Sequence, residues 1–341
     1  MIPRTLLTRG ALAAVLPLAL ALHAAEPPAP SPGWNVTDHV VCKDVVVQSH
    51  RGAGELAEEN TLEAFELGWR LGTYPESDVR TTSDGVIVTF HDNTFKRVVR
   101  NVTPELENKG VGDVTFSTLS SLEVGAWHGA DFVAHRIPRL ADVFVAMRGR
   151  PERHLYLDIK NVDLRQLAAL VNESGVDRQV VLATSKPDTI REWKKLVPES
   201  DTLLWMRGGE KGLGKRIQAL RQSDFSGITQ LQIHIFPLAS IQEALEIAGA
   251  SPRQIEYSAD QANPARGPYA LPDAFIVGLG KELRARGILF QALPYTSDPS
   301  VYARLLDLGV ASFATDHPDV TERELRRYYD RKASARPDTA R

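Results

Sequence analysis

The sequence is poor in cysteine and in net charge, and each shortage excludes a class of protein. Cys42 is the only cysteine among 341 residues, so no disulfide can form within the chain. The net charge of −3 gives no reason to expect a nucleic-acid partner. A chain of this length, with 43% hydrophobic residues, can bury a core large enough to fold without disulfides.

Two common binding signatures are also missing. No glycine-rich phosphate loop follows the first strand-like segment, which argues against a doubly wound open sheet. No Cys–His spacing of the kind that holds zinc is present either. Any metal-dependent chemistry therefore has to depend on carboxylate oxygens, which suit Ca²⁺ and Mg²⁺.

Long apolar runs are scarce as well. The run at residues 11–22 is short of the roughly 20 residues that a membrane-spanning helix needs. Arg4 and Arg9 precede it, and Ala24 and Ala25 follow it, which is the pattern of a secretory signal peptide. An uncleaved membrane anchor is the alternative interpretation of the same residues.

This pattern predicts the order of segments along the chain. We expect a signal peptide at residues 1–25, a proline-rich linker at 26–40, a barrel domain at 41–322, and a C-terminal helix and tail at 323–341. The mature protein should have no stable membrane anchor. An exported protein without disulfides fits the bacterial periplasm or the secreted fraction.

Strand-like and helix-like segments alternate along most of the chain, which predicts an α/β fold with a largely parallel sheet. Nine segments look like strands, at residues 45–49, 76–79, 86–90, 154–159, 179–183, 202–206, 228–235, 289–293 and 311–314. Polar residues recur at the ends of these segments, as they do at the carboxyl face of a (β/α)8 TIM barrel. A barrel needs eight strands, and we expect the surplus among residues 202–235.

Helix-like segments lie between most of the strand-like ones, at residues 163–171, 188–196, 240–248, 272–286 and 299–307. The first helix is expected to begin at Asn60, with Glu63 completing a capping box, and to end at Gly72. Residues 93–137 do not alternate, and we interpret them as an insertion after the third strand that covers the site. Trp127 and His128 in this insertion should then affect substrate binding; a small packed subdomain is the alternative.

Three carboxylates are embedded in the apolar strand-like runs. Glu76 and Asp78 are two residues apart, so both side chains point to the same face of a strand. Asp158 has the same placement on a later strand. Carboxylates that share a buried face repel one another unless a cation lies between them. We therefore predict that these three residues bind one divalent cation, Ca²⁺ or Mg²⁺.

Two histidines and two basic side chains complete the predicted site. His50 and His91 each follow a strand directly, and a pair of imidazoles can divide the work of proton acceptor and proton donor. Arg51 offers a planar pair of donors for phosphate oxygens, and Lys160 offers a compact charge. This combination suits metal-assisted acid–base chemistry on a phosphate ester.

These residues resemble the glycerophosphodiester phosphodiesterases. The motifs that carry the resemblance run in order along the chain: His50-Arg51-Gly52, Glu59-Asn60-Thr61, Glu76-x-Asp78, Thr82-x-Asp84-Gly85, His91-Asp92 and Thr315-Asp316-x-Pro318. The resemblance implies a (β/α)8 barrel, a divalent metal, and hydrolysis of glycerophosphodiesters to glycerol phosphate and an alcohol. It makes His50 and His91 the acid–base pair and Glu59 a supporting carboxylate beside the substrate.

The sequence departs from that family at two places. Asp158-x-Lys160 stands where the family has Glu-x-Lys, a spacing that also resembles the related sphingomyelinase D-type phospholipases. Gln291-Ala292-Leu293-Pro294 replaces the usual Trp-Thr-Val-Asn of the penultimate strand. Release or cyclisation of a lysophospholipid headgroup is therefore one alternative function. A non-catalytic periplasmic binding protein is an alternative from another class.

Overall fold

A computed structural model describes residues 36–125, 134–258 and 264–335. By its internal contacts the chain divides into two units, residues 1–30 and 31–341, and the first unit lies outside the described residues. The predicted signal peptide, most of the predicted linker, and Trp127 and His128 also lie outside them, so these remain predictions. Among the described helices, none combines the length and the apolarity that crossing a bilayer requires.

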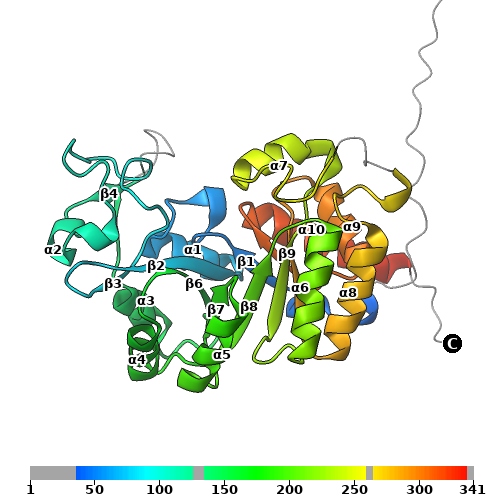
Figure 1. Ribbon diagram of the computed structural model, residues 1–341, viewed down its shortest axis with the longest axis horizontal. Helices are drawn as coiled ribbons and strands as arrows, with labels where there is room; N and C mark the ends of the chain where they lie inside the picture. The colour runs from blue at the N-terminus through cyan, green and yellow to red at the C-terminus, as the bar shows by residue number, and fades with distance from the viewer. Residues whose placement is uncertain (1–35, 126–133, 259–263, 336–341) are drawn as a thin grey trace, which may run out of the picture. The chain divides into compact units, whose positions relative to one another are not determined.

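Eight parallel strands close into a barrel, which confirms the predicted fold (Figure 1). In chain order the strands are β1 (Val46–Ser49), β2 (Tyr74–Thr81), β6 (Leu155–Asn161), β7 (Val180–Thr184), β8 (Asp201–Met206), β9 (Gln230–His234), β10 (Leu289–Leu293) and β11 (Ser312–Thr315). The barrel closes because β1 pairs in parallel with both β2 and β11. The carboxyl ends of all eight strands therefore face one shared mouth.

One of the nine strand-like segments, residues 86–90, contains β3 (Ile87–Thr89), which is not a barrel strand. It runs antiparallel to the end of β2, with Val79 opposite Thr89. The expectation of a surplus strand within residues 202–235 is therefore wrong, because β8 and β9 both belong to the barrel. The physical reason lies in the turn between β2 and β3. This turn is short and contains Gly85, whose φ is 85°. A short turn joins two neighbouring strands in antiparallel orientation, whereas parallel neighbours need a long crossover.

Helices surround the barrel strands (Figure 1). They are α1 (Leu62–Leu71), α3 (Leu140–Met147), α4 (Leu164–Ser174), α5 (Pro187–Leu196), α6 (Glu210–Gln222), α7 (Ile241–Ile247), α8 (Asp273–Ala285), α9 (Pro299–Asp307) and α10 (Pro318–Ala335). Short 3-10 turns are η1 (Val36–Asp38), η2 (Cys42–Asp44), η3 (Gly54–Leu56), η6 (Leu238–Ser240) and η8 (Pro264–Arg266). The apolar sides of the helices pack on the strands and form the core, with fully buried Phe65, Trp193 and Tyr302.

Helix α1 begins one residue later than predicted. Its N-cap is Thr61, whose side-chain oxygen accepts a hydrogen bond from the backbone N–H of Ala64 at 3.1 Å. Asn60 has a left-handed φ of 58°, and its amide bonds to Asp78 instead of capping the helix. The capping prediction is therefore wrong, because a partner on another strand takes the Asn60 side chain. Gly72 ends the helix as predicted.

The insertion is a packed subdomain in its described part. It contains η4 (Val111–Asp113), α2 (Phe116–Leu119), β4 (Glu123–Val124) and β5 (His135–Arg136). Its buried apolar residues form a separate cluster with the end of the β2–β3 hairpin: Val88, Phe90, Phe95, Val98, Val99, Val111, Val114, Leu119, Leu122, Val124 and Ile137. This described part lies across the mouth of the barrel from α7 (Figure 1). The two interpretations differ at Trp127, which lies outside the described residues, so the expected effect of Trp127 and His128 on substrate binding stays a prediction.

Candidate active site

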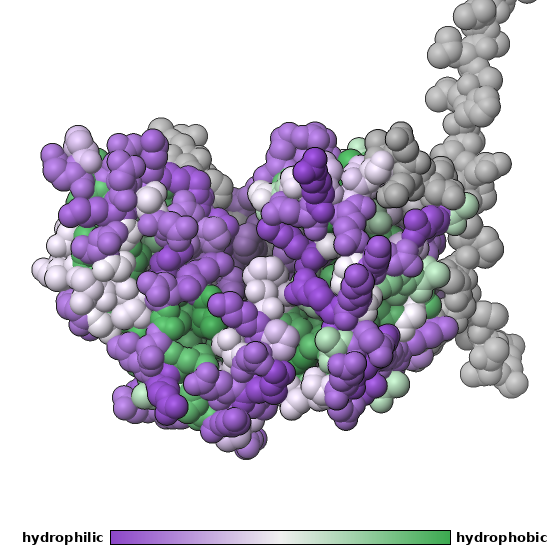
Figure 2. Space-filling model, viewed as in Figure 1, coloured by the Kyte–Doolittle hydropathy of each residue, from purple (hydrophilic) through white to green (hydrophobic). Residues whose placement is uncertain are grey.

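A cavity of about 330 Å³ opens at the carboxyl ends of the barrel strands. Figure 2 shows the surface hollowed between the insertion and α7, with mainly hydrophilic residues around the hollow. Six of the eight predicted site residues line this cavity, namely His50, Arg51, Glu76, His91, Asp158 and Lys160. Glu59 and Asp78 are buried directly behind them, at 4% and 1% exposure. The sequence-based site is thus brought together in one place.

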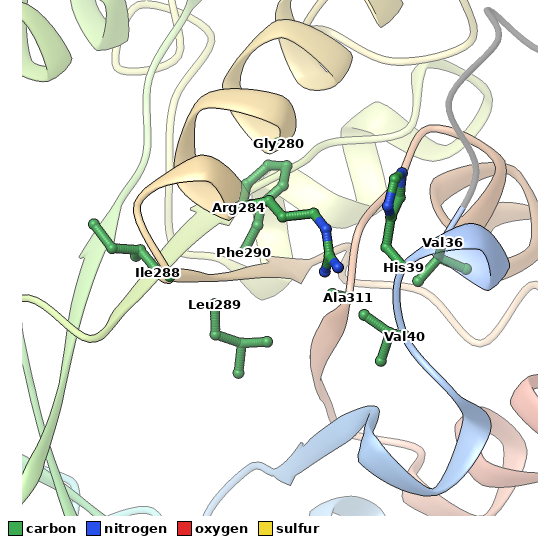
Figure 3. Close-up of a pocket in the computed structure, with 11 residues that line it drawn as sticks. Val36, His39, Val40, Gly280, Arg284, Ile288, Leu289, Phe290 and Ala311 are labelled. Atoms are coloured by element: carbon green, nitrogen blue, oxygen red, sulfur yellow. The ribbon is translucent and has the colours of Figure 1, made fainter.

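A second cavity, of about 210 Å³, lies near the amino ends of β10 and β11 (Figure 3). Its lining comes from the first described segment, from α8 and from the start of β10, and is mainly apolar, as with Val36, Val40 and Phe290. No carboxylate is among the described residues that line it. Acid–base or metal chemistry therefore belongs to the mouth of the barrel.

The three predicted metal ligands form one cluster. Asp78 on β2 lies opposite Asp158 on β6 in the strand register, and Glu76 is two residues before Asp78. Each residue offers an oxygen, and these oxygens all lie within 4.8 Å of one another. Burial and the neighbouring Asp78 raise the pKa of Glu76 to about 8. The cluster therefore holds more negative charge than its surroundings tolerate without a cation.

Two basic side chains offset part of this charge. Lys160 Nζ lies 2.6 Å from Asp158 Oδ2 and 3.0 Å from Asp78 Oδ1. Arg51 Nε lies 3.8 Å from Asp78 Oδ2. Once a cation binds and Glu76 loses its proton, two positive and three negative side chains carry one net negative charge. A divalent cation together with a singly charged phosphodiester would neutralise this charge. The residues present therefore fit a hard divalent cation with oxygen ligands.

Asn60 fixes the central carboxylate of the cluster. Its side-chain Nδ2 donates to Asp78 Oδ2 at 2.8 Å, and its Oδ1 accepts from the backbone N–H of Asp78 at 2.9 Å. Burial alone would raise the pKa of Asp78, but Lys160, then His91 and Arg51, hold it well below its usual range. Asp78 thus stays ionised and correctly oriented as a ligand.

The loop after β1 presents His50 and Arg51 to the cavity. Arg51 has a left-handed φ of 51°, and its backbone N–H donates to Glu76 Oε2 at 2.7 Å. Gly52 follows with a φ of 112°, and a Cβ atom there would lie 2.6 Å from the Cβ of Ala64 on α1. Only glycine permits this close approach, so the His50-Arg51-Gly52 motif has a steric cause.

His50 pairs with a carboxylate from the other end of the chain. Its Nδ1 lies 2.5 Å from Asp316 Oδ1, which leaves the second ring nitrogen for the cavity. Burial would lower the pKa of His50, but the Asp316 carboxylate more than offsets this effect, so the pKa is raised. Burial would raise the pKa of Asp316, but the His50 imidazole lowers it to about 2. The sequence motif contained Asp316, but its role was not predicted.

His91 has a similar partner. Its Nδ1 lies 2.7 Å from Asp92 Oδ1, so both histidines are held by a carboxylate at the same ring nitrogen. Burial would raise the pKa of Asp92, but hydrogen bonds from His91 and Arg97 keep it well below its usual range. A carboxylate at Nδ1 fixes the tautomer and the orientation of an imidazole. Both side chains are therefore prepared for proton transfer at their other nitrogen.

Arg97, from the insertion, connects Glu59 with Asp92. Its guanidinium donates two hydrogen bonds to Glu59, at 2.7 and 2.8 Å, and two to Asp92, both at 2.8 Å. Glu59 also accepts from Arg51 Nη1 at 3.2 Å. Glu59 thus supports Arg51, the arginine predicted to bind phosphate, and Asp92 supports His91. No sequence signal pointed to Arg97, because its partners lie on separate segments.

Replacing Arg97 by lysine should lower kcat/KM by about ten- to a hundredfold, the usual loss when a partner that orients a site residue is removed. A lysine ammonium cannot match the planar fork that bonds two carboxylates at once. Steady-state kinetics and a thermal unfolding midpoint measure the effect and the folding of the variant. Arg136→Lys, an exposed arginine of the same insertion, is the matched control. Unchanged kinetics in Arg97→Lys would contradict this role.

The opposite end of the cavity was not predicted. Trp205, His234 and Tyr295 line it, together with Gln48 and Gln232. His234 stands out in the sequence only as one of nine histidines, and no motif marks Trp205 or Tyr295. These residues follow from the closure of the barrel, which places β8, β9 and β10 across the mouth from β2.

The arrangement supports acid–base chemistry on a phosphate ester. Two oriented imidazoles, two cationic donors and a carboxylate cluster surround one cavity. The carboxylates fit a cation that can polarise phosphoryl oxygens. The imidazoles can accept and donate a proton, and Arg51 and Lys160 can bind the phosphate oxygens.

Comparison with known proteins agrees with this chemistry. The sequence profile of the Glycerophosphoryl diester phosphodiesterase family matches residues 50–320. A glycerophosphodiester phosphodiesterase of Caldanaerobacter subterraneus subsp. tengcongensis is 28% identical over 160 residues, covering 45% of this chain and 63% of that protein. A glycerophosphodiester phosphodiesterase of Bacillus subtilis is 22% identical over 287 residues, covering 83% of this chain and 87% of that protein. The chain thus spans less than two thirds of the first relative.

Solved structures share the fold. A glycerophosphodiester phosphodiesterase from Agrobacterium tumefaciens gives a TM-score of 0.56 at 23% identity, covering 83% of this chain and 99% of that one. An Oleispira antarctica phosphodiesterase, in complex with the product sn-glycerol-3-phosphate, gives a TM-score of 0.57 at 19% identity, covering 82% of this chain and 96% of that one. The family profile covers most of the sequence, including both histidines and all three clustered carboxylates. This chain belongs to the Glycerophosphoryl diester phosphodiesterase family.

Proposed function

We propose that this protein is a metal-dependent phosphodiesterase that hydrolyses glycerophosphodiesters to glycerol phosphate and an alcohol. One observation carries the proposal: two histidines, each held by a carboxylate at Nδ1, line the same cavity as Glu76 and Asp158, which form a carboxylate cluster with the buried Asp78. Family membership and the relative in complex with sn-glycerol-3-phosphate support the choice of substrate.

The side chains divide the reaction as follows. Arg51 and Lys160 bind the phosphate oxygens, and Glu59 keeps the Arg51 guanidinium in place. His50 and His91 act as the acid–base pair, one on the attacking water and the other on the leaving oxygen. Because Nδ1 of each ring is occupied by a carboxylate, proton transfer takes place at Nε2.

Glu76, Asp78 and Asp158 hold the cation, which is Ca²⁺ or Mg²⁺ because both prefer carboxylate oxygens. When bound, this cation supplies Lewis-acid stabilisation of the charge that builds up on the phosphate oxygens. The shorter Asp158 side chain brings its oxygen into the cluster from β6, the strand next to β2.

Phosphorus NMR of the reaction products tests this function. Glycerophosphodiesters and lysophospholipids are incubated with the purified protein and each metal in turn. We expect glycerol phosphate from the glycerophosphodiesters, with one oxygen from ¹⁸O-labelled water at phosphorus. Cyclic phosphates from lysophospholipids would favour the sphingomyelinase D-type alternative. No turnover of any diester with any metal would favour the non-catalytic binding protein.

We also propose that the protein acts outside the cytoplasm, in a bacterial periplasm or as a secreted enzyme. The support is the sequence of residues 1–25, in which basic residues, a short apolar run and small residues follow one another. Amino-terminal sequencing of the protein from a periplasmic extract should find a start near residues 22–26. An intact amino terminus in the membrane fraction would contradict this proposal.

A further inference from the structure

A third cavity, of about 450 Å³, opens next to the main one, where the insertion begins. Six described residues line it: Arg80, His91, Asp92, Asn93, Thr94 and Lys160. Two of them, His91 and Lys160, also line the main cavity and so lie at the boundary between the two. A diester whose phosphate lies against these two side chains can therefore extend one of its organic groups into the third cavity.

The strand β2 places Arg80 in this cavity. Arg80 lies two residues after Asp78, so in a regular strand both side chains point to the same face. The register with β6 shifts between Val79 and Arg80, so that β6 carries one extra residue, Lys160, at this point. Such a bulge turns side chains at the edge of an active site. It brings Arg80 and Lys160 to the same cavity.

Three neutral acceptors hold the Arg80 guanidinium in place. Its Nε donates to the carbonyl oxygens of Phe90 and His91, both at 3.2 Å, and its Nη2 donates to the His91 carbonyl oxygen at 2.6 Å. Nη2 also donates to Asn93 Oδ1 at 2.9 Å. Among the described residues, none accepts a hydrogen bond from Nη1. The Nη1 donors of a fixed guanidinium are thus left for a ligand.

The positive charge of Arg80 has no counter-ion in the described part of the chain. Its side chain is partly buried and forms no ion pair with a described carboxylate. The other charges of the cavity are paired, since Asp92 accepts from Arg97 at 2.8 Å, and Lys160 donates to Asp158 at 2.6 Å. A partly buried cation is stabilised when an anion pairs with it. An anionic ligand would therefore complete this cavity.

Asn93 and Thr94 add neutral donors beside the guanidinium. Because Arg80 donates to Asn93 Oδ1, the amide is oriented so that its Nδ2 is left as a donor. The hydroxyl-bearing Thr94 lines the same cavity. A guanidinium, an amide N–H and a hydroxyl together suit the oxygens of a carboxylate or a phosphate. A quaternary ammonium group offers none of these donors an acceptor.

We propose that Arg80, with Asn93 and Thr94, binds an oxyanion on the leaving alcohol of the substrate, either a carboxylate or a phosphate, and so selects anionic glycerophosphodiesters. The leaving alcohol is the group concerned because His91, which we expect to protonate the leaving oxygen, lies at the boundary of the third cavity. This inference rests on the proposed function and specifies one part of the substrate. Hydrolysis of glycerophosphodiesters by itself predicts no preference among leaving alcohols.

Substrates that differ only in one anionic group test the proposal. Glycerophosphoserine and glycerophosphoethanolamine share the glycerol, the phosphate and the ammonium group, and only the first has a carboxylate. We expect kcat/KM to be higher for glycerophosphoserine by about tenfold or more, the value of a hydrogen bond to a charged group. A second pair, glycerophosphoglycerol with and without a phosphate on its outer hydroxyl, distinguishes a phosphate from a carboxylate. A ratio near one for both pairs would overturn the proposal.

Two variants show whether Arg80 causes the preference. Arg80→Gln removes the positive charge, and Asn93→Asp keeps the acceptor for Arg80 but adds a negative charge beside it. In both variants the ratio of the two kcat/KM values should fall to about one to three, because the anion loses its pairing with a cation. Asn93 is exposed, so Asn93→Asp should fold even if Arg80→Gln does not.

The matched control is Arg178→Gln, since Arg178 is an exposed arginine just before β7, at the amino end of that strand. This variant should keep the ratio of the wild-type protein. The bound cation offers another way to prefer a carboxylate, and that preference would survive both substitutions in the third cavity. A wild-type ratio in Asn93→Asp, and in Arg80→Gln if it folds, would therefore overturn the proposal.

Calorimetry separates this proposal from the proposed function, because it needs no turnover. O-phosphoserine and O-phosphoethanolamine carry the phosphate and the leaving alcohol but no glycerol. We expect the metal-loaded protein to bind O-phosphoserine about tenfold more tightly, and Asn93→Asp to lose the difference. This result in a protein that hydrolyses no diester would refute the proposed function and leave the oxyanion site standing. Hydrolysis of diesters with no preference for an anionic alcohol would refute the oxyanion site and leave the proposed function standing.

Discussion

Chelation with EDTA is expected to abolish phosphodiester hydrolysis, and added Ca²⁺ or Mg²⁺ should restore it. Glu76→Gln should lower kcat/KM by at least about a hundredfold, because a Lewis acid at a phosphoryl oxygen contributes several kcal/mol to the transition state. The substitution keeps the shape of the side chain but replaces a buried anionic ligand by a neutral amide. Asp78 and Asp158 then share the cation without their third partner.

Thermal unfolding supplies a readout besides activity. A cation that binds only the folded state raises the unfolding midpoint of the wild-type protein with its concentration. Glu76→Gln should fold, yet its midpoint should hardly respond to metal. Asp188→Asn, a highly exposed carboxylate on α5, is the control and should respond like the wild type. Full activity in a chelated, metal-free preparation would rule out the metal site.

The sequence was sufficient to predict the convergence of the site, because parallel strands of a barrel end at one face. Glu76 and Asp158 lie on strands separated by the whole insertion, yet their apolar runs and terminal acids were enough to place them together. The direction of pairing was harder to predict. Residues 86–90 look like any other buried strand, and only the short turn at Gly85 distinguishes a hairpin from a barrel strand.

Residues whose role depends on a distant partner could not be predicted in the same way. Asp316 follows the last strand and holds His50, 266 positions earlier, only because β11 closes the barrel against β1. Asn60 has the sequence context of a helix cap, but its contact with Asp78 gives it another role. Arg97 has no periodic or motif signal, and it becomes important because the insertion folds back onto Glu59.

If His50 and His91 are the acid–base pair that we propose, replacing either one by alanine should lower kcat by about 10²–10⁴-fold, the usual contribution of general acid–base catalysis. The kcat of the double variant His50→Ala/His91→Ala should be hardly lower than that of the less active single variant, because the effects of substitutions in groups that act as a unit do not add. Stopped assays with a natural glycerophosphodiester measure both effects. His39→Ala is the control, because His39 lies in the first described segment and lines the second cavity, near the amino ends of β10 and β11.

An activated leaving group separates the two roles. A p-nitrophenyl ester needs little protonation of its leaving oxygen, so the variant that lost the acid should recover most of its activity on that substrate. We expect His91 to be the acid and His50 to act on the attacking water, and this substrate decides between that assignment and the reverse one. If neither variant loses activity on a natural diester, the mechanism is wrong.

The pH dependence gives an independent test of His50 through its partner. Asp316 raises the pKa of His50 against the opposing effect of burial, so Asp316→Asn should lower that pKa. If His50 works as a base, its neutral form is active and the acidic limb of the pH–rate profile should move to lower pH. If it works as an acid, its protonated form is active and the alkaline limb should also move to lower pH. The limb that moves therefore identifies the role, and the other limb serves as an internal control. A profile that keeps both limbs in place, in a variant whose unfolding midpoint shows that it folds, would mean that His50 does not titrate during catalysis.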